Sequence, residues 1–169
     1  MKISNDRKYD VIGIGSALLD FTVEVNDADL DSFNLKKGEM LLIDENQSKE
    51  ILSKLENYNM TTTPGGSSAN TIAGVASFNG NGVLMGRVGN DKHGNLYISE
   101  TEKVGVKTQI TMGNAITGHA ITFITPDSER SFATHLGAAI NFDKNDVSAN
   151  AIKDSKIIHF EGYLFEPPN

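Results

Sequence analysis

A glycine pair followed by small polar residues stands at positions 64–71, where the chain reads Pro-Gly-Gly-Ser-Ser-Ala-Asn-Thr. Apolar residues then recur at the spacing of one helix face: Ala69, Ile72, Ala73 and Ala76. We expect a helix to start here, with Ser67 as its cap. Backbone N–H groups at a helix start attract polar or anionic ligands, and glycine lets a ligand approach the backbone closely. Asn70 in the first turn would point its amide at such a ligand; the alternative is an ordinary loop-to-helix junction.

Other site chemistries have weaker support in this chain. Gly13 and Gly15 follow a predicted strand, but a dinucleotide-binding turn needs a third glycine where this sequence has Leu18. The glycine pair also lacks the lysine of a Walker A loop. The four histidines are scattered along the sequence: His93, His119, His135 and His159. Because they lack ligand spacing and the chain has no cysteine, we expect no metal site built by protein side chains.

The composition is that of a soluble globular protein. Of 169 residues, 38% are hydrophobic and 22% are charged, which is enough for one domain with a real core. The formal net charge of −7, without a basic run, argues against a nucleic-acid partner. No apolar run approaches the ~20 residues that span a membrane, and the polar N-terminus has no signal-peptide pattern. These features and the absence of cysteine fit a cytoplasmic protein without a membrane partner.

Strand and helix patterns alternate along the chain, which predicts an α/β fold. Apolar runs that indicate strands lie at 9–15, 21–25, 40–43, 83–86 and 156–160. Asp44 and Gln47 have the spacing of a capping box, so a helix should follow them. Further helical patterns follow the glycine pair, run from Asp91 to Gly105, and recur weakly at 147–154.

Two half-exposed β segments, near 20–43 and 118–136, do not fit the layered core. In the second, two alternating runs flank residues 126–129, where Pro, Asp and Ser indicate a hairpin turn. His119 and His135 could meet across this hairpin. We expect the two segments to pack together as a small sheet over one end of the core.

Three blocks carry a resemblance to a known family. They are 13–20 (GIGSALLD), 65–70 (GGSSAN) and 86–94 (GRVGNDKHG). In order and spacing they resemble the N-terminal half of the PfkB-type carbohydrate kinases, the ribokinase and adenosine kinase family. Residues 128–131 (SERS) and 161–164 (EGYL) resemble the adenosine kinase-like branch in particular. The resemblance covers nearly the whole chain.

The resemblance implies a Rossmann-like ribokinase fold, with an α/β/α core and a small β-sheet lid. On this reading the core holds residues 1–15, 44–112 and 141–169, and the lid holds 16–43 and 113–140. The implied activity of the intact protein is ATP-dependent phosphorylation of a primary hydroxyl of a sugar or nucleoside, with Mg²⁺. Adenosine, another nucleoside and a free sugar all remain open as substrates, as does a homodimer formed through the lid.

The resemblance also implies a set of substrate-binding positions: Ser16, Leu18, Asp20, Leu42, Gly65, Gly66, Ser67, Asn70, Phe132 and Leu136. The carboxylate of Asp20 would accept hydrogen bonds from both hydroxyls of a ribose-like diol. The leucines and Phe132 would line a nucleobase pocket. Arg130 is the one catalytic candidate, since it would approach the transferring phosphates when the lid closes. Ser16 departs from the branch, which typically has asparagine there.

One part of the family pattern is absent from this chain. The second family signature, Asp-Thr-x-Gly-Ala-Gly-Asp, supplies the general base and the anion hole, and no such segment occurs here. The family's Asn-x-x-Glu motif, which is tied to Mg²⁺ and phosphate, does not occur either. We therefore expect the C-terminal part of the fold to be missing and these residues alone to have no useful kinase turnover. The alternative is a non-catalytic sugar- or nucleoside-binding module.

Overall fold

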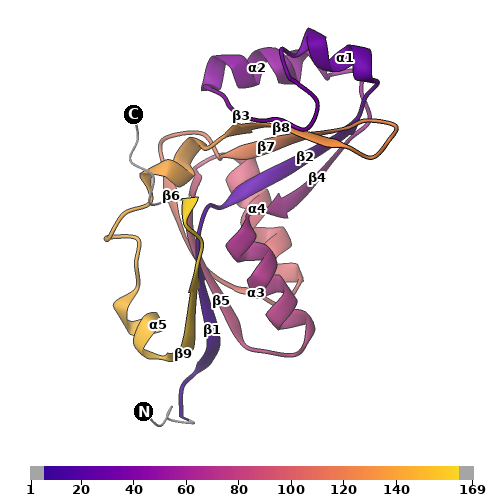
Figure 1. The fold of residues 1–169 in the computed structure, drawn as a ribbon. Coiled ribbons are helices and arrows are strands. Elements are labelled where there is room, and N and C mark those ends of the chain that lie inside the picture. Colours follow the sequence, from indigo (N-terminus) through magenta and orange to yellow (C-terminus); the bar gives the residue numbers. More distant parts are fainter. Residues whose placement is uncertain (1–5, 164–169) are drawn as a thin grey trace.

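The computed structural model describes residues 6–163, which form two β-sheets with helices against them (Figure 1). Leu164, the last residue of one family-like motif, lies outside the described residues, as do the remaining C-terminal residues and positions 1–5. No helix in the described part of the chain has the length and apolar character needed to cross a membrane. The α/β architecture predicted from the sequence is confirmed.

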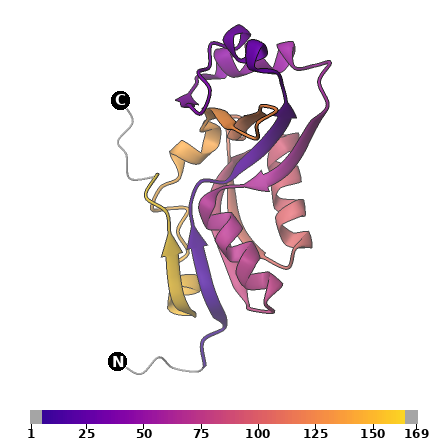
Figure 2. The ribbon, with the colours of Figure 1, turned by 45° about the vertical axis from the view of Figure 1, so that its right-hand side comes forward.

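The first sheet is parallel, and its strand order is β6-β5-β1-β9. Its strands are β1 (Tyr9–Ile14), β5 (Gly82–Gly89), β6 (Lys107–Gly113) and β9 (Ser155–Phe160). In Figure 2, β9 (yellow) lies beside β1 (indigo) at one edge. The edge strand β9 exposes the apolar side chains of Ile157, Ile158 and Phe160.

Helices lie on both faces of the first sheet. Neighbouring residues of a strand point to opposite faces. Gly13 of β1 faces Ile72 in α3 (Ser67–Ser77), whereas Ile12 packs with Ala151 in α5 (Ala149–Lys153). The helix α4 (Lys92–Lys103) follows β5 and lies on the same side as α3, and the 3₁₀ segment η1 (Gly137–Asn141) contacts β5. The helix before β5 and the helix before β9 therefore lie on opposite faces of the sheet, with β1 between these two strands.

The second sheet has the strand order β3-β8-β7-β2-β4. Its strands are β2 (Leu18–Glu24), β3 (Met40–Leu42), β4 (Met60–Gly65), β7 (His119–Ile124) and β8 (Arg130–His135). The predicted hairpin is confirmed as β7 and β8. Helices α1 (Asp27–Ser32) and α2 (Glu45–Lys54) cover one face, where the tilted rings of Phe33 and Phe123 pack with centroids 4.9 Å apart. The predicted capping box of Asp44 and Gln47 starts α2.

Strand β4 is a difference from the sequence analysis. Residues 44–112 were expected in the core, but β4 pairs with β2 in the second sheet and α2 contacts β8. The run Met-Thr-Thr-Thr has no apolar alternation because its threonines are exposed on an edge strand. The pairing with β2 forms this strand, and the residues of the run carry no local pattern that predicts that pairing.

The junction between the sheets is held by Asp91, the N-cap of α4. Its carboxylate accepts hydrogen bonds from the N–H of Gly94 and of Thr117, both at 2.8 Å, and from the Thr117 hydroxyl at 2.7 Å. Burial alone would raise the pKa of Asp91, but these hydrogen bonds lower it overall. A Cβ on Gly94 would lie 2.1 Å from the carbonyl oxygen of Gly89, so this close approach needs glycine. The 86–94 block therefore has an architectural role.

His119 is buried where β7 leaves this junction. The sequence suggested a meeting with His135, and the two rings lie across the hairpin with centroids 5.6 Å apart. A carbonyl oxygen can only accept, so His119 Nδ1–H donates to Thr117 O at 3.2 Å, and Nε2 accepts from the Ser48 hydroxyl at 2.6 Å. Burial lowers the pKa of His119 to about 4, helped by His135 and His93.

The buried neutral imidazole of His119 predicts that the free energy of unfolding falls as the pH is lowered. The unfolded chain binds a proton at its ordinary pKa of 6.5, whereas the folded chain resists protonation down to about 4. The free energy of unfolding is therefore expected to fall by about 1–2 kcal/mol between roughly pH 6.5 and 5, above the range where carboxylates dominate. His119→Gln should flatten this dependence in urea titrations followed by circular dichroism. His159→Gln on β9 is the control, and an unchanged pH slope in His119→Gln would contradict the assignment.

Candidate functional site

The two sheets meet at the carboxyl end of β1. Two of the connections between them lie side by side there, from β1 to β2 through residues 15–17 and from β4 to α3 through Gly65 and Gly66. Ile14 and Phe160 pair side by side, so β1 and β9 end together at this edge. In open α/β sheets, ligands bind outside the carboxyl ends of strands at the point where the connections change face. The fold alone thus directs attention to this edge.

The glycine pair is shaped by its neighbours. Gly66 has φ +98°, and a Cβ there would lie 2.2 Å from the carbonyl oxygen of Ser16. A Cβ on Gly65 would lie 2.3 Å from Asp20 Oδ2. The hydroxyl of Tyr97, which is fully buried, donates to Gly65 O at 3.1 Å. Burial raises the pKa of Tyr97, and the nearby carboxylates of Glu161 and Asp20 raise it further, so this donor stays protonated.

The start of α3 differs from the prediction in two respects. Gly66 is the N-cap, and Ser67 is the first helical residue, so Ser67 does not cap the helix. The N–H of Ser68 is not free for a ligand, because it donates to Glu161 Oε2 at 2.9 Å. The side chains of Ser67 and Asn70 are exposed at this helix start, and their contact with a ligand stays a prediction. The predicted apolar face is confirmed, with Ile72 fully buried.

Glu161 is the residue that the sequence analysis missed as part of the site. It follows β9 and is only 9% exposed. Its second oxygen, Oε1, accepts from the N–H of Ser16 at 2.6 Å. The only sequence signal was its place in the family-like block 161–164, which assigned it no role.

Strand register places the predicted ligand-binding residues of the second sheet on one face. Asp20 pairs with Ala120, Ala120 with Thr134, and Thr134 with Leu42, and paired residues share a face. By alternation, that face presents the predicted residues Leu18, Asp20, Leu42 and Phe132. The opposite face, with Phe123, is the one that α1 and α2 cover. The predicted residues therefore converge on the open face.

The carboxylate of Asp20 lies half-buried at the glycine pair. Burial raises its pKa. No cation or hydrogen-bond donor among residues 6–163 pairs with it, in contrast with Asp91 and Glu161. A half-buried carboxylate with unused lone pairs is a candidate for ligand binding.

The apolar part of this face lies on β3 and β8. Leu42 is 56% exposed, and Met40, which pairs with Phe132, is 61% exposed. Leu18 and Leu136 converge at Gly118, where a Cβ would lie 2.5 Å from Leu18 Cδ2 and 2.2 Å from Leu136 O. These exposed apolar side chains make this face a candidate ligand-binding surface.

Arg130 lies apart from Asp20. It is exposed at the start of β8 and pairs with Ile124, whereas Asp20 pairs with Ala120 of the same strand β7. Four residues along a strand separate these pairs, about 13 Å. The phosphate-directed role of Arg130 stays a prediction.

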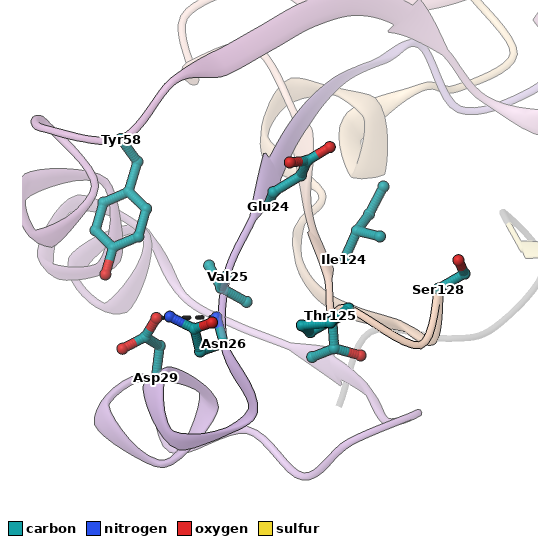
Figure 3. Close-up of a pocket in the computed structure, with 9 residues that line it drawn as sticks. Glu24, Val25, Asn26, Asp29, Tyr58, Ile124, Thr125 and Ser128 are labelled. Carbon is teal, nitrogen blue, oxygen red and sulfur yellow. Dashed lines mark hydrogen bonds between the residues drawn. The ribbon is translucent and has the colours of Figure 1, made fainter.

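Two cavities lie at the far end of the second sheet, and Figure 3 shows the residues that line the larger one. The larger, about 420 Å³, is lined by Glu24, Val25, Asn26, Asp29, Tyr58, Ile124, Thr125, Pro126 and Ser128. None of the predicted site residues lines it, and the Asn26 N–H and the Asp29 carboxylate bond each other as the cap of α1. Since Asn26 and Asp29 serve helix capping and no predicted site residue lies here, we place the candidate site at the sheet junction.

Metal ligands are not grouped in the described residues. No set of three or more His, Asp or Glu side chains between positions 6 and 163 is arranged to hold a metal ion. The polar groups left without a partner among the described residues at this site are the Asp20 carboxylate, which can accept, and the buried hydroxyls of Ser16 and Ser68. That chemistry suits a neutral ligand rich in hydroxyl groups.

Comparison with known proteins agrees with this geometry. Residues 32–169 match the model of the pfkB family carbohydrate kinases. The chain is 31% identical to an adenosine kinase of Saccharomyces cerevisiae over 162 residues, covering 90% of this chain and 47% of that protein. The chain thus spans about half the length of the curated relatives it matches.

Solved structures give the same result. A probable sugar kinase from Rhizobium etli superposes with a TM-score of 0.87 at 33% identity, covering 96% of this chain and 49% of that one. An adenosine kinase from Sinorhizobium meliloti superposes with a TM-score of 0.85 at 35% identity, covering 95% and 49%. The expected ribokinase-like fold is confirmed.

Two glycine-to-alanine substitutions, one in the glycine pair and one within α3, are expected to have opposite effects on the free energy of unfolding. Gly66→Ala should lower the free energy of unfolding by about 2–4 kcal/mol, because its Cβ meets backbone and its φ is positive. Gly74→Ala in the same helix meets nothing within 4 Å and should raise stability by about 0.5–1 kcal/mol. Urea unfolding of both variants measures this, and equal effects would contradict the described turn.

Proposed function

The chain belongs to the pfkB family of carbohydrate kinases, and from this premise we propose that it supplies the substrate-binding half of a nucleoside kinase. The proposed reaction of the intact protein transfers the γ-phosphoryl group of ATP to a primary hydroxyl of the substrate. The observation that carries the proposal is the register that sets the unpaired Asp20 and the exposed apolar side chains on one face.

Asp20 is proposed to bind the vicinal diol of a ribose. Both oxygens of one carboxylate can accept hydrogen bonds from two neighbouring hydroxyls, and such charge-assisted bonds are strong where water is excluded. The buried hydroxyl of Ser16, which has no partner among the described residues, is a further group that a ligand hydroxyl could satisfy. Ser67 and Asn70 are proposed to contact the same ligand from the helix start.

The width of the face favours a nucleoside over a free sugar. Asp20 and Leu42 are three strand spacings apart, about 14 Å. A single sugar ring bound at Asp20 would leave Leu42 and Phe132 uncovered, whereas a nucleoside extends a base toward them. Adenosine is the proposed substrate to test first, because relatives at 31% and 35% identity are named adenosine kinases.

ATP and Mg²⁺ enter this proposal from the family. Mg²⁺ would neutralise charge on the transferring phosphates. Since the described residues offer no group of carboxylates for it, we assign it no ligand in this chain. Arg130 is proposed to stabilise phosphate charge when the second sheet closes. Lacking the aspartate-bearing loop, these 169 residues are proposed to bind nucleoside without turnover.

Asp20→Asn tests the proposal through opposite effects on binding and stability. The variant should weaken adenosine binding by about 100-fold, because it removes a charged acceptor of two hydrogen bonds. It should also stabilise the fold at neutral pH, because burial raises the pKa of Asp20 and charging it there costs stability. In the wild type this cost grows as pH rises from the unfolded-state pKa through the raised folded one.

Isothermal titration calorimetry with adenosine and urea unfolding provide the two readouts. Asp31→Asn, an exposed site on α1, is the matched control and should change neither. Wild-type affinity in Asp20→Asn would contradict the role of Asp20. A wild-type protein that binds neither adenosine nor another nucleoside would overturn the proposed function itself.

A further inference from the structure

Glu161 is a buried carboxylate that the proposed reaction does not use. Its two oxygens accept N–H groups that lie 145 and 93 residues away in the sequence, those of Ser16 and Ser68. The carboxylate thereby joins three segments: the end of β9, the turn after β1, and the first turn of α3.

The residues around Glu161 leave room for its carboxylate and stabilise its negative charge. A Cβ on Gly15 would lie 2.7 Å from Glu161 Cδ, so a larger residue there would displace the carboxylate. The charge sits at the positive end of the dipole of α3, an 11-residue helix, and both of its bonds are charge-assisted. These interactions offset the cost of burying a carboxylate, which is large without partners.

The segments joined by Glu161 are the ones that carry the proposed ligand contacts. Ser16 precedes Leu18 and Asp20 at the start of β2, and Ser68 stands between Ser67 and Asn70 on α3. The ladder between β2 and β4 ends at the pair of Leu18 with Gly65, and beyond it Gly66 closely approaches the carbonyl oxygen of Ser16. Past the end of the ladder, the Glu161 carboxylate adds a hydrogen-bonded link between Ser16 and Ser68, and so holds the turn against the helix.

We propose that Glu161 is a positioning residue, which fixes the distance between the Ser16–Asp20 segment and the start of α3 and so pre-forms the nucleoside pocket. This inference rests on the proposed function. Pre-organised contacts raise affinity because ordering is not required on binding. Loss of the link should therefore weaken ligand binding more than it reduces the amount of folded protein.

The test compares Glu161→Gln with the wild type by calorimetry with adenosine. The amide keeps the side chain's shape but offers one oxygen to two N–H groups. We expect the dissociation constant to rise about tenfold, the loss of one such hydrogen bond, with an unchanged stoichiometry. A purely structural role would lower the stoichiometry and leave the dissociation constant as it is. Glu50→Gln on α2, an exposed glutamate paired with Lys54, is the control and should match the wild type.

Amide hydrogen exchange supplies a second readout that needs no ligand. Ser16 and Ser68 should lose protection in Glu161→Gln, while Ile12 in the middle of β1 keeps it. Unchanged protection, or an unchanged dissociation constant, overturns the inference and leaves the proposed function standing. A wild type that binds no nucleoside overturns the proposed function and the positioning role with it. If the variant loses protection at the Ser16 and Ser68 amides and also binds adenosine more weakly, the proposed function and the positioning role of Glu161 are both supported.

Discussion

The close approach of Gly66 to the carbonyl oxygen of Ser16 is the constraint on which the site depends. At this point the connection from β1 to β2 touches the connection from β4 to α3, and no side chain fits between them. The contact sets the start of α3 against the turn after β1. Because β2 begins two residues later, it also sets Asp20 beside Gly65.

Three carboxylates near the meeting of the sheets, one buried and two half-buried, differ in their hydrogen bonding. Asp91 accepts bonds that cap α4 and hold Thr117, and Glu161 accepts two backbone N–H groups. Asp20 has no partner among residues 6–163, and its pKa is raised by burial. A fold that satisfies two carboxylates and leaves the third unpaired beside exposed apolar side chains has retained an unfavourable charge. Such a cost is typical of a functional position.

Because side chains alternate along each strand, the second sheet has one face that packs against helices and one face that presents the proposed ligand-binding residues. One face packs Phe123 against Phe33 beneath α1 and α2, and the other presents Asp20 and Leu42. Every strand contributes to both faces, so a shift of one residue in register would exchange them. The buried pair of His119 with Ser48 anchors the supporting face and thereby the register of β7.

The sequence by itself determined the α/β class, the capping box of Asp44, the β7–β8 hairpin and the apolar face of α3, because these depend on residues close together in the chain. The family-like blocks also pointed to Asp20 and the glycine pair as candidate ligand-binding residues, which stays a prediction. Only the tertiary structure decided that β4 joins the second sheet, that Gly66 and not Ser67 caps α3, and that Glu161 occupies the helix N–H. Those features are contacts between segments far apart in sequence, and local spacing carries no information about which distant backbone group a carboxylate will meet.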